Sequence, residues 1–359
     1  MNNFGKKLRI TLFGASHEPF IGIVIDGYPA GITLDMSLIR SKLKLRKGLG
    51  ALTSLRLEND DFQITSGYFQ NYTTGAPITI LVKNEDVKSA DYEKQYGIAR
   101  PSHGDLVLHE KFHGFNDYRG GGTASGRLTV VLVILGSLCE QLLKQRNIWV
   151  GSIIKSLGNI VDDRGDITLE DIQTLADNPF PVRDNQDKDK MLEAIKQASL
   201  NQDSLGAIVQ TGAFNLPIGL GQPFFDSVES IVSHLMFSIP GVKGIEFGSG
   251  FQMAIKTGSM VNDPMFYQDS QVKYSTNNAG GINSGITNGN PLIFQTAFRP
   301  TPSIGLCQDT VDFIKKTDVK YEIKGRHDVV FAIKGLHVVN ALTNYAILEM
   351  LFEENLWTS

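Results

Sequence analysis

The sequence predicts one domain that mixes β-strands with α-helices. Two short apolar stretches, residues 7–13 and 21–25, alternate as strands do and are separated by a polar turn. Residues 128–142 instead repeat apolar side chains at helical spacing. The only linker-like stretch, residues 184–189, is short, and no internal repeat interrupts the chain. We therefore expect a single domain over residues 1–359.

The composition is that of a soluble globular protein. The chain is 42% hydrophobic and 20% charged, and it carries a formal net charge of −4. A negative balance argues against a general nucleic-acid binder. Cys139 and Cys307 are too far apart in sequence to indicate a zinc site or a disulfide framework. We expect no nucleic-acid partner and no metal.

Neither the N-terminus nor the longest apolar run indicates a membrane or secretion. The first residues, MNNFGKKLRITLFG, lack the long apolar segment of a secretory signal. The run over residues 128–139 is shorter than the roughly 20 residues that cross a bilayer. The sequence therefore predicts a cytoplasmic protein without a membrane partner.

Taken in order, the first elements place one histidine at a strand end. His17 lies in the turn between the two N-terminal strands, where its side chain can project into a site. Asp35 can then cap a helix that starts at Met36 and carries several basic residues. Residues 158–205 are charged and helix-prone and indicate no chemistry.

The most informative stretch is residues 100–129, which precede and enter the apolar helix. Three consecutive glycines, at positions 120–122, allow the backbone to bend or a ligand to approach closely. Thr123 and Ser125 can cap the helix behind them, and a helix N-terminus attracts anions. Arg100, Arg119 and other arginines add guanidinium groups suited to phosphate or carboxylate. The stretch predicts an anion-binding site.

The order of these motifs resembles the chorismate synthases. RPSHGD, DYRGGG and SGRLT follow the central signature of that family, FGASHEPFIGIVIDGYPAGI its opening signature, and GRHDVVFAIKGLHVVNAL its closing one. RLEND, TTGAPI, NNAGGINSGITNG and FRPTPSI resemble further family segments. The likeness spans nearly the whole chain except about residues 158–205. Departures from the usual residue types occur at Ala15, Glu18, Leu45, Thr123, Ser284, Arg299, Val329 and Lys334.

The resemblance implies a fold, a reaction and partners. The fold would be α+β, the family's β-α-β sandwich with helices layered between two antiparallel sheets, assembled as a homotetramer. The reaction would be 1,4-anti elimination of phosphate from 5-enolpyruvylshikimate 3-phosphate, which gives chorismate in the shikimate pathway of aromatic amino-acid biosynthesis. It would need reduced FMN, supplied by an external flavin reductase or another source of reduced flavin, and NADP is expected in that supply step.

The resemblance also implies roles for individual residues. His17 would protonate the leaving phosphate, His103 would neutralise charge on the reduced flavin, and Asp328 would serve proton transfer at the flavin. The substrate-binding guanidinium groups would be Arg46, Arg100, Arg119 and Arg127. The flavin contacts would be Thr123, Ala124, Ser125, Ser284, Arg299, Thr301, Pro302, Ser303 and Arg326.

Two alternatives from other classes stay open. The departures from the family pattern allow a degenerate, non-catalytic protein that binds flavin or anions. His109-Glu110-Lys111-Phe112-His113 is a literal HExxH, the pattern of a zinc peptidase helix. Gly114 would end such a helix at the motif, and Arg119 stands where a third ligand is usual. The chain has no P-loop and no complete dinucleotide fingerprint.

Overall fold

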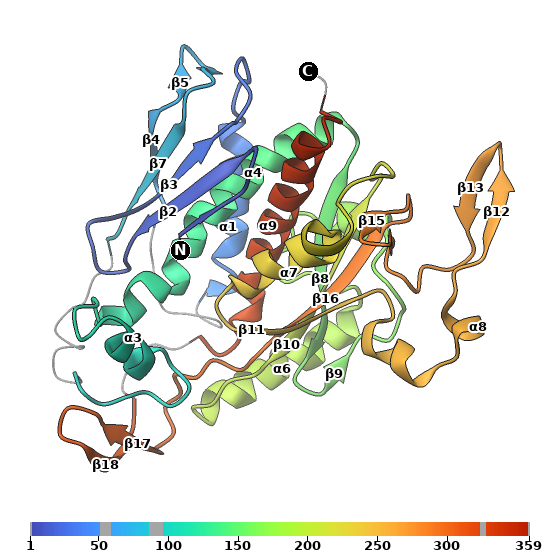
Figure 1. Cartoon of the computed structure of the whole chain (residues 1–359). Helices are drawn as coiled ribbons and strands as arrows, with labels where there is room; N and C mark the ends of the chain where they lie inside the picture. The colour runs from blue at the N-terminus through green and yellow to red at the C-terminus, as the bar shows by residue number, and fades with distance from the viewer. Residues whose placement is uncertain (1, 51–58, 86–95, 324–327, 358–359) are drawn as a thin grey trace.

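Two antiparallel five-stranded sheets enclose a layer of helices (Figure 1). The computed structural model describes residues 2–50, 59–85, 96–323 and 328–357. Every strand pair in both sheets is antiparallel. The expected α+β sandwich, with helices between two antiparallel sheets, is therefore confirmed.

The first sheet contains both strands that the sequence predicted. Its strand order is β1-β2-β3-β7-β4. Its strands are β1 (Asn3–Phe4), β2 (Arg9–Gly14), β3 (Phe20–Asp26), β4 (Phe62–Ser66) and β7 (Ile78–Lys83). The register pairs Arg9 with Asp26 and Gly14 with Ile21, so the turn that carries His17 closes the β2–β3 hairpin. The predicted bounds differ from the observed ones by one or two residues.

The second sheet lies on the other side of the helices. Its strand order is β11-β16-β10-β8-β9. Its strands are β8 (Trp149–Leu157), β9 (Ile160–Val161), β10 (Ala207–Phe214), β11 (Val242–Phe247) and β16 (Leu292–Phe298). Side chains alternate across a strand, so Ile154 joins the main core while Ile153 joins a small cluster with Ile172 on the other face.

Helices form the layer between the sheets, and the two longest are buried on nearly all sides because both faces are covered. The helices of this layer are α1 (Met36–Arg46), α4 (Thr129–Gln145), α7 (Val228–Phe237) and α9 (Ala332–Glu353). Asp35 accepts from the backbone N of Leu38 at 2.9 Å, which confirms the predicted cap of α1. Helices α4 and α9 approach closely, since a methyl group at Gly136 would lie 2.2 Å from Ala341 Cα. Any side chain at Gly136 would push these two helices apart.

One helical stretch passes the length and composition test for a membrane span. Residues 126–145 are 20 residues long with a mean hydropathy of 1.6, longer than the apolar run read from the sequence. However, 89% of this stretch is buried inside the protein, between the two sheets. Its apolar character is therefore used by the core.

The remaining helices and the short hairpins lie outside the central helix layer, and one of these helices packs its Ile172 on the outer face of the second sheet. The outer helices are α3 (Asp105–Lys111), α5 (Leu169–Leu175), α6 (Asn185–Leu200) and α8 (Gly258–Val261). The short hairpins are β5 (Tyr68–Phe69) with β6 (Tyr72–Thr73), β12 (Met265–Gln268) with β13 (Gln271–Tyr274), β14 (Ile282–Asn283) with β15 (Ile286–Thr287), and β17 (Gln308–Asp312) with β18 (Thr317–Tyr321). Figure 1 shows β12, β13 and α8 projecting away from the body.

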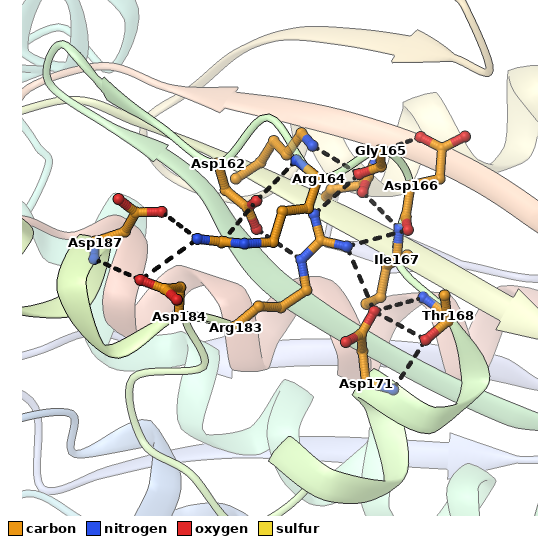
Figure 2. Close-up of polar contacts among 12 residues, drawn as sticks. Asp162, Arg164, Gly165, Asp166, Ile167, Thr168, Asp171, Arg183, Asp184 and Asp187 are labelled. Atoms are coloured by element: carbon orange, nitrogen blue, oxygen red, sulfur yellow. Dashed lines mark hydrogen bonds and ion pairs between the residues drawn. The ribbon is translucent and has the colours of Figure 1, made fainter.

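The helix-prone segment 158–205 does form α5 and α6, but its supposed linker was misread. Residues 184–189 are the start of α6, because the Asp184 carboxylate accepts from the backbone N of Gln186 and Asp187. Charge density there reflects helix capping and ion pairing, shown in Figure 2, rather than chain flexibility.

Candidate active site

The glycine loop, defined as residues 119–125, brings the two predicted catalytic histidines to one place. Gly120, Gly121 and Gly122 all have positive φ, at 60°, 99° and 55°. A methyl group at Gly120 would lie 2.4 Å from His17 Cε1, and one at Gly121 would lie 3.6 Å from His103 Cε1. At Gly120 only glycine combines this backbone with such close approach, whereas at Gly121 the positive φ is the constraint and His103 lies at ordinary contact distance. Adjacent glycines therefore contact histidines from two distant turns.

His17 is held in the β2–β3 turn against the glycine loop. The residue is 9% exposed, and its Nδ1 lies 3.0 Å from Ser16 Oγ. Ser16 is anchored in turn, because its backbone N donates to Gly122 O and its hydroxyl donates to Arg119 O. The ring is thus fixed through Ser16 to the same loop that it packs on.

His103 is reached through a local turn at the start of α3. The His103 backbone N donates to Arg100 O at 3.0 Å, and Ser102 between them has a φ of 59°. Pro101 before a residue with positive φ is typical of a type II turn. The turn places Arg100 and His103 on either side of Asp105. Asp105 Oδ1 lies 2.8 Å from His103 Nδ1.

All four predicted substrate-binding arginines pair with carboxylates of the chain itself. The Arg119 fork meets Asp117 through Nε and Nη2, both at 2.8 Å. The Arg100 fork meets Asp105 through Nε at 2.8 Å and Nη2 at 2.6 Å. The sequence alone suggested positive charges that were available to an anion, but in the structure these guanidinium groups are paired with carboxylates.

The other two arginines share one buried carboxylate. Asp60, 5% exposed, accepts from Arg127 and lies 3.9 Å from Arg46 Nη1. Arg46 also donates to Gly126 O, and both its Nε and Nη2 reach Thr129 Oγ1 at the start of α4. Arg127 is only 7% exposed, so its hydrogen bonds within the chain hold the structure together.

Burial and ion pairing act in opposite directions on the carboxylates near the histidines. Burial opposes ionisation of Asp105, but hydrogen bonds from Arg100 and His103 outweigh it and hold the pKa of Asp105 well below its usual range. For Asp117, the hydrogen bond from Arg119 is the main cause of its lowered pKa, and the His17 charge adds to it. Both carboxylates are acceptors only at neutral pH.

Of the two residues that the sequence predicted as caps of the helix behind the glycine loop, one does cap it. Ser125 Oγ accepts from the backbone N of Arg127 at 3.3 Å and caps a short 3₁₀ turn, η3 (Gly126–Leu128), that leads into α4. Thr123 makes no such cap and is exposed, as is Ala124. Ser125 is therefore the capping hydroxyl, and the capping role expected of Thr123 was wrong.

The loop of residues 299–303 has buried polar atoms without a partner among the described residues. These atoms are Arg299 Nε and Thr301 Oγ1. The loop is held in place by Ser204 Oγ, which donates to Thr301 O at 2.7 Å, and by the Arg299 backbone N, which donates to Gly241 O. Unpaired buried donors are costly, so these atoms fit a polar ligand.

Asp328 lies just before α9, close to the end of the glycine loop. Phe331 packs there, since a methyl group at Gly126 would lie 3.2 Å from its ring. The Asp328 carboxylate accepts from Lys334 Nζ at 2.7 Å. Lys334, a departure from the family pattern, thus keeps a cation beside the predicted proton-transfer residue.

Comparisons with known proteins agree along the full length of the chain. The sequence profile described as chorismate synthase matches residues 8–352. The chorismate synthase of Pyrococcus abyssi is 41% identical over 353 residues, which are 98% of each chain. That of Chitinophaga pinensis is 42% identical and covers 99% of this chain and 97% of its own. The chain belongs to the chorismate synthase family.

A solved chorismate synthase structure supports the fold. It superposes with a TM-score of 0.76, at 24% identity, over 98% of this chain and 93% of its own. The family reaction, elimination of phosphate from 5-enolpyruvylshikimate 3-phosphate to give chorismate, is therefore the activity of this chain, and the family uses reduced flavin.

The HExxH segment does not have the geometry of a zinc peptidase helix. Helix α3 ends at Lys111, and His113 lies beyond it with a φ of 54°. His109 instead packs on Phe313, with ring centroids 4.8 Å apart. The two histidines do not share a helical face, as the glycine after the motif predicted.

One predicted flavin contact is not brought to the site within this chain. Ser284 lies in the β14–β15 turn, which packs on Gln222, and Gln222 Nε2 donates to Glu354 just past the end of α9. Asp328 lies before the opposite end of this 22-residue helix, which is about 33 Å long. Arg326 lies outside the described residues.

Three of the departures from the family pattern, Ala15, Leu45 and Ser284, have local structural consequences. Ala15 and Leu45 are 1% and 8% exposed, so both fill core space where a charge would be costly. Ser284 has a φ of 55°, in the left-handed region that explains why glycine is usual there. The chain pays this small strain while retaining His17, His103 and Asp328.

Sequence reasoning missed the carboxylates that hold the site together. Asp105 and Asp117 stand inside the motifs RPSHGD and DYRGGG, only five and two residues from the arginines they bind. That spacing was a usable signal. Asp60, in contrast, meets Arg127 across 67 residues, which no local pattern predicts.

Proposed function

We propose that the family reaction takes place beside the glycine loop, with His17 and His103 as separate proton donors. The observation that carries this is the contact of both histidines with adjacent glycines. His17 would give a proton to the leaving phosphate, and His103 would hold positive charge against the reduced flavin. Asp328, kept beside Lys334, would accept or pass a proton near the flavin.

Anaerobic turnover with reduced FMN and 5-enolpyruvylshikimate 3-phosphate tests this function. We expect stoichiometric release of chorismate and phosphate. Flavin binding without product would instead favour the degenerate, non-catalytic alternative. Loss of turnover in His17→Ala and in His103→Ala, with flavin still bound, would support two separate roles.

For the substrate we propose that guanidinium groups meet its carboxylates and phosphate. Arg119 is the most accessible, with 33% of its side chain exposed. Arg46 and Arg127, whose guanidinium groups both lie at Asp60, would contribute as buried hydrogen-bond donors. Arg100 differs from Arg119 in that only 14% of its side chain is exposed while its fork lies on Asp105. Arg119→Gln should raise the substrate KM by roughly 10- to 150-fold, the value of a charge-assisted hydrogen bond.

The flavin we propose is FMN, held by the loop of residues 299–303 and the end of the glycine loop. The unpaired Arg299 Nε and Thr301 Oγ1 support a polar group such as the FMN phosphate. Pro302 fixes the loop backbone. The further proposed contacts are Ser303, Thr123, Ala124, Ser125 and Arg326. Reduced FMN supplies the electron density that assists loss of phosphate.

We propose weaker FMN affinity than in typical relatives, because Thr123 lacks the charge usual at its position. A charge-assisted hydrogen bond is worth roughly 1.5–3 kcal/mol. Substrate should tighten flavin binding by closing the pocket over the ring. Flavin fluorescence titration with and without substrate measures both effects. Affinity that is independent of substrate would contradict the coupling.

Self-association as a homotetramer is the assembly we propose. The arm formed by residues 250–275 projects from the body and exposes large apolar side chains, which supports a protein partner (Figure 1). These exposed residues are Phe251, Ile255, Met260, Met265, Phe266, Tyr267 and Val272. The arm is tied to the segment before β14, because the Asp263 carboxylate accepts from the backbone N of Asn278 and Ala279. A docked arm would therefore carry Ser284 to a neighbouring copy, the one way in which Ser284 could serve as a flavin contact.

Sedimentation of the double variant Phe251→Asp/Ile255→Asp tests the arm. These two side chains are 78% and 81% exposed, so the charges should not disturb folding. We expect the tetramer to dissociate. Val161→Asp, 57% exposed on β9, is the matched control and should leave the assembly intact. An unchanged tetramer in the double variant would exclude the arm.

We further propose a cytoplasmic enzyme that functions as one domain over residues 1–359. Core residues of both sheets and of the helix layer form one continuous apolar cluster, which supports a single folding unit. Reduced flavin would come from an external reductase. Addition of a flavin reductase and NADPH to the aerobic enzyme should restore turnover if supply is the limiting step.

A further inference from the structure

We infer that Asp105 is a positioning residue that fixes the ring of His103 with Nε2 toward the glycine loop, and that Arg100 supports Asp105 rather than the substrate. The inference rests on the proposed function of His103. It assigns roles to a carboxylate that sequence reasoning passed over and to an arginine that it placed on the substrate.

The Asp105 carboxylate is saturated with hydrogen bonds from its own turn. Its Oδ2 accepts from the backbone N of Arg100 at 3.0 Å and from Arg100 Nε at 2.8 Å. Its Oδ1 accepts from Arg100 Nη2 at 2.6 Å and meets His103 Nδ1 at 2.8 Å. An ionised carboxylate offers about four acceptor positions, so this one is filled by the turn itself.

The contact between Asp105 and His103 selects one tautomer of the imidazole ring. The ionised Asp105 can only accept, so His103 Nδ1 must carry the hydrogen. The remaining nitrogen, Nε2, lies on the side of the glycine loop, where a methyl group at Gly121 would be 3.8 Å away. Asp105 therefore decides which nitrogen of His103 faces the site, as carboxylate partners of functional histidines do elsewhere.

Arg100 is committed to the same carboxylate. Its Nε and Nη2 both donate to Asp105, and only 14% of its side chain is exposed. A substrate carboxylate that approached this edge of the guanidinium would have to compete with Asp105 for the same N–H groups. The type II turn at Pro101 and Ser102 enforces the pairing, because it brings the Arg100 carbonyl to the His103 backbone N.

Other ionisable groups surround the trio without replacing Asp105. The Arg119–Asp117 pair lies on the glycine loop, and His109 lies on α3 beside the pocket that Arg100, Asp105 and Asp117 also line. Tyr321 of β18 interacts with both Arg100 and Asp105, and burial raises the pKa of its hydroxyl, so it stays neutral. Of these groups, Asp105 is the one in hydrogen-bond contact with the His103 ring.

A double-mutant cycle tests whether Asp105 acts through His103. Asp105→Asn should lower kcat by roughly 10- to 100-fold, the usual cost of losing such a partner, with substrate KM changed by less than about 3-fold. In the His103→Ala background the same substitution should cost less than about 3-fold, because the group it positions is gone. Equal losses in both backgrounds would overturn the inference and leave Asp105 a structural residue.

A second readout does not need turnover. In ¹⁵N-histidine-labelled, flavin-free protein above the imidazole titration range, ring correlations report the tautomer, and His103→Ala identifies the signal. We expect the Nδ1–H form in the unmodified protein and appearance of the Nε2–H form in Asp105→Asn. An unchanged tautomer would overturn the inference even if the enzyme proved inactive, so its failure is distinct from failure of the proposed function.

Two further variants complete the test. Asp162→Asn removes a buried carboxylate that also accepts from arginines but contacts no histidine among the described residues. It should leave both the His103 tautomer and kcat per folded enzyme unchanged. Arg100→Gln should change substrate KM by less than about 3-fold, whereas a rise of roughly 10-fold or more would restore Arg100 to the substrate and overturn its assigned role.

Discussion

Two clusters of arginine and aspartate, one beside the glycine loop and one near β9, use the same chemistry for different ends. In the second cluster, Asp162 is fully buried and accepts from Arg183 Nε at 2.6 Å and Arg164 Nη1 at 3.0 Å (Figure 2). Arg183 continues to the carbonyl oxygens of Gly165 and Asp166, and Arg164 to Asp187. This network ties the loop after β9 to α5 and α6.

The two clusters differ in the further groups that their arginine and aspartate side chains contact. Near β9 the remaining donors go to carbonyl groups and further carboxylates, so the cluster is closed upon itself. Beside the glycine loop, Asp105 holds His103, and the Asp117–Arg119 pair borders His17. Arginine-aspartate pairs alone therefore do not indicate a site. The adjoining histidines and left-handed glycines do.

The largest expected effect separates the two clusters by turnover. His17→Ala should lower kcat by on the order of 10²–10⁴-fold, because it removes a proton donor. The free energy of unfolding should also fall, because the His17 ring is only 9% exposed, so the rate is compared per folded molecule. Chorismate formation under anaerobic conditions, with reduced FMN, measures the loss. A near-normal rate would remove His17 from the mechanism and leave the glycine loop with one active histidine.

At Asp162 we expect a loss of stability with nearly unchanged turnover. Asp162→Asn should lower the free energy of unfolding by about 3 kcal/mol, because it leaves the buried Arg183 guanidinium, and the more exposed one of Arg164, without their shared charge. Urea unfolding measures this. Turnover per folded molecule should stay within about 2-fold of the unmodified enzyme. A catalytic defect without a stability loss would show that the two clusters are not functionally distinct.

A matched pair of glycines sharpens the comparison. Gly120 and Gly165 have φ of 60° and 76°, so alanine at either position should cost roughly 1–2 kcal/mol of stability. A methyl group at Gly165 meets nothing within 4 Å, whereas at Gly120 it would overlap the His17 ring at 2.4 Å. Only Gly120→Ala should therefore also impair turnover. Equal activity of the two variants would mean that His17 can move without consequence.

Both clusters should weaken in acid. Burial opposes ionisation of Asp162, but hydrogen bonds from Arg183 and Arg164 outweigh it and lower its pKa, as arginine and histidine do for Asp105. A folded-state pKa below the unfolded value of about 3.9 stabilises the protein above that pH, and the stabilisation is lost as pH falls through the folded pKa. Urea unfolding from neutral pH to below pH 4 should thus show a shallower acid loss in Asp162→Asn and in Asp105→Asn. Unchanged acid dependence would contradict the assigned ion pairs.

The smallest effect is expected at the HExxH segment, residues 109–113, which follows His103 in the sequence. His113→Ala should leave turnover unchanged, because His113 lies beyond α3 and shares no helical face with His109. Elemental analysis of the purified enzyme should find no stoichiometric zinc. Zinc that disappears when both His109 and His113 are replaced would overturn this.

The sequence by itself determined the local parts of this protein. Alternation gave β2 and β3, the apolar periodicity gave α4, and Asp35 gave the start of α1, because each depends on neighbours in the chain. The histidines and the triple glycine could be identified from the sequence for the same reason, because each stands in a short local motif. A run of charged residues is compatible with either a linker or a helix start. Residues 184–189 were predicted to be linker-like, but they begin α6.

Only the tertiary structure decided how those parts serve each other. The partners of Arg127 and Arg46 come from residues far away in sequence, so charges that looked available are paired with Asp60. The contact of His17 with Gly120 joins segments about a hundred residues apart, and Ser284 falls at the wrong end of α9 for a site in the same chain. Long-range packing of two sheets around one helix layer fixes these distances, and no periodicity or spacing records them.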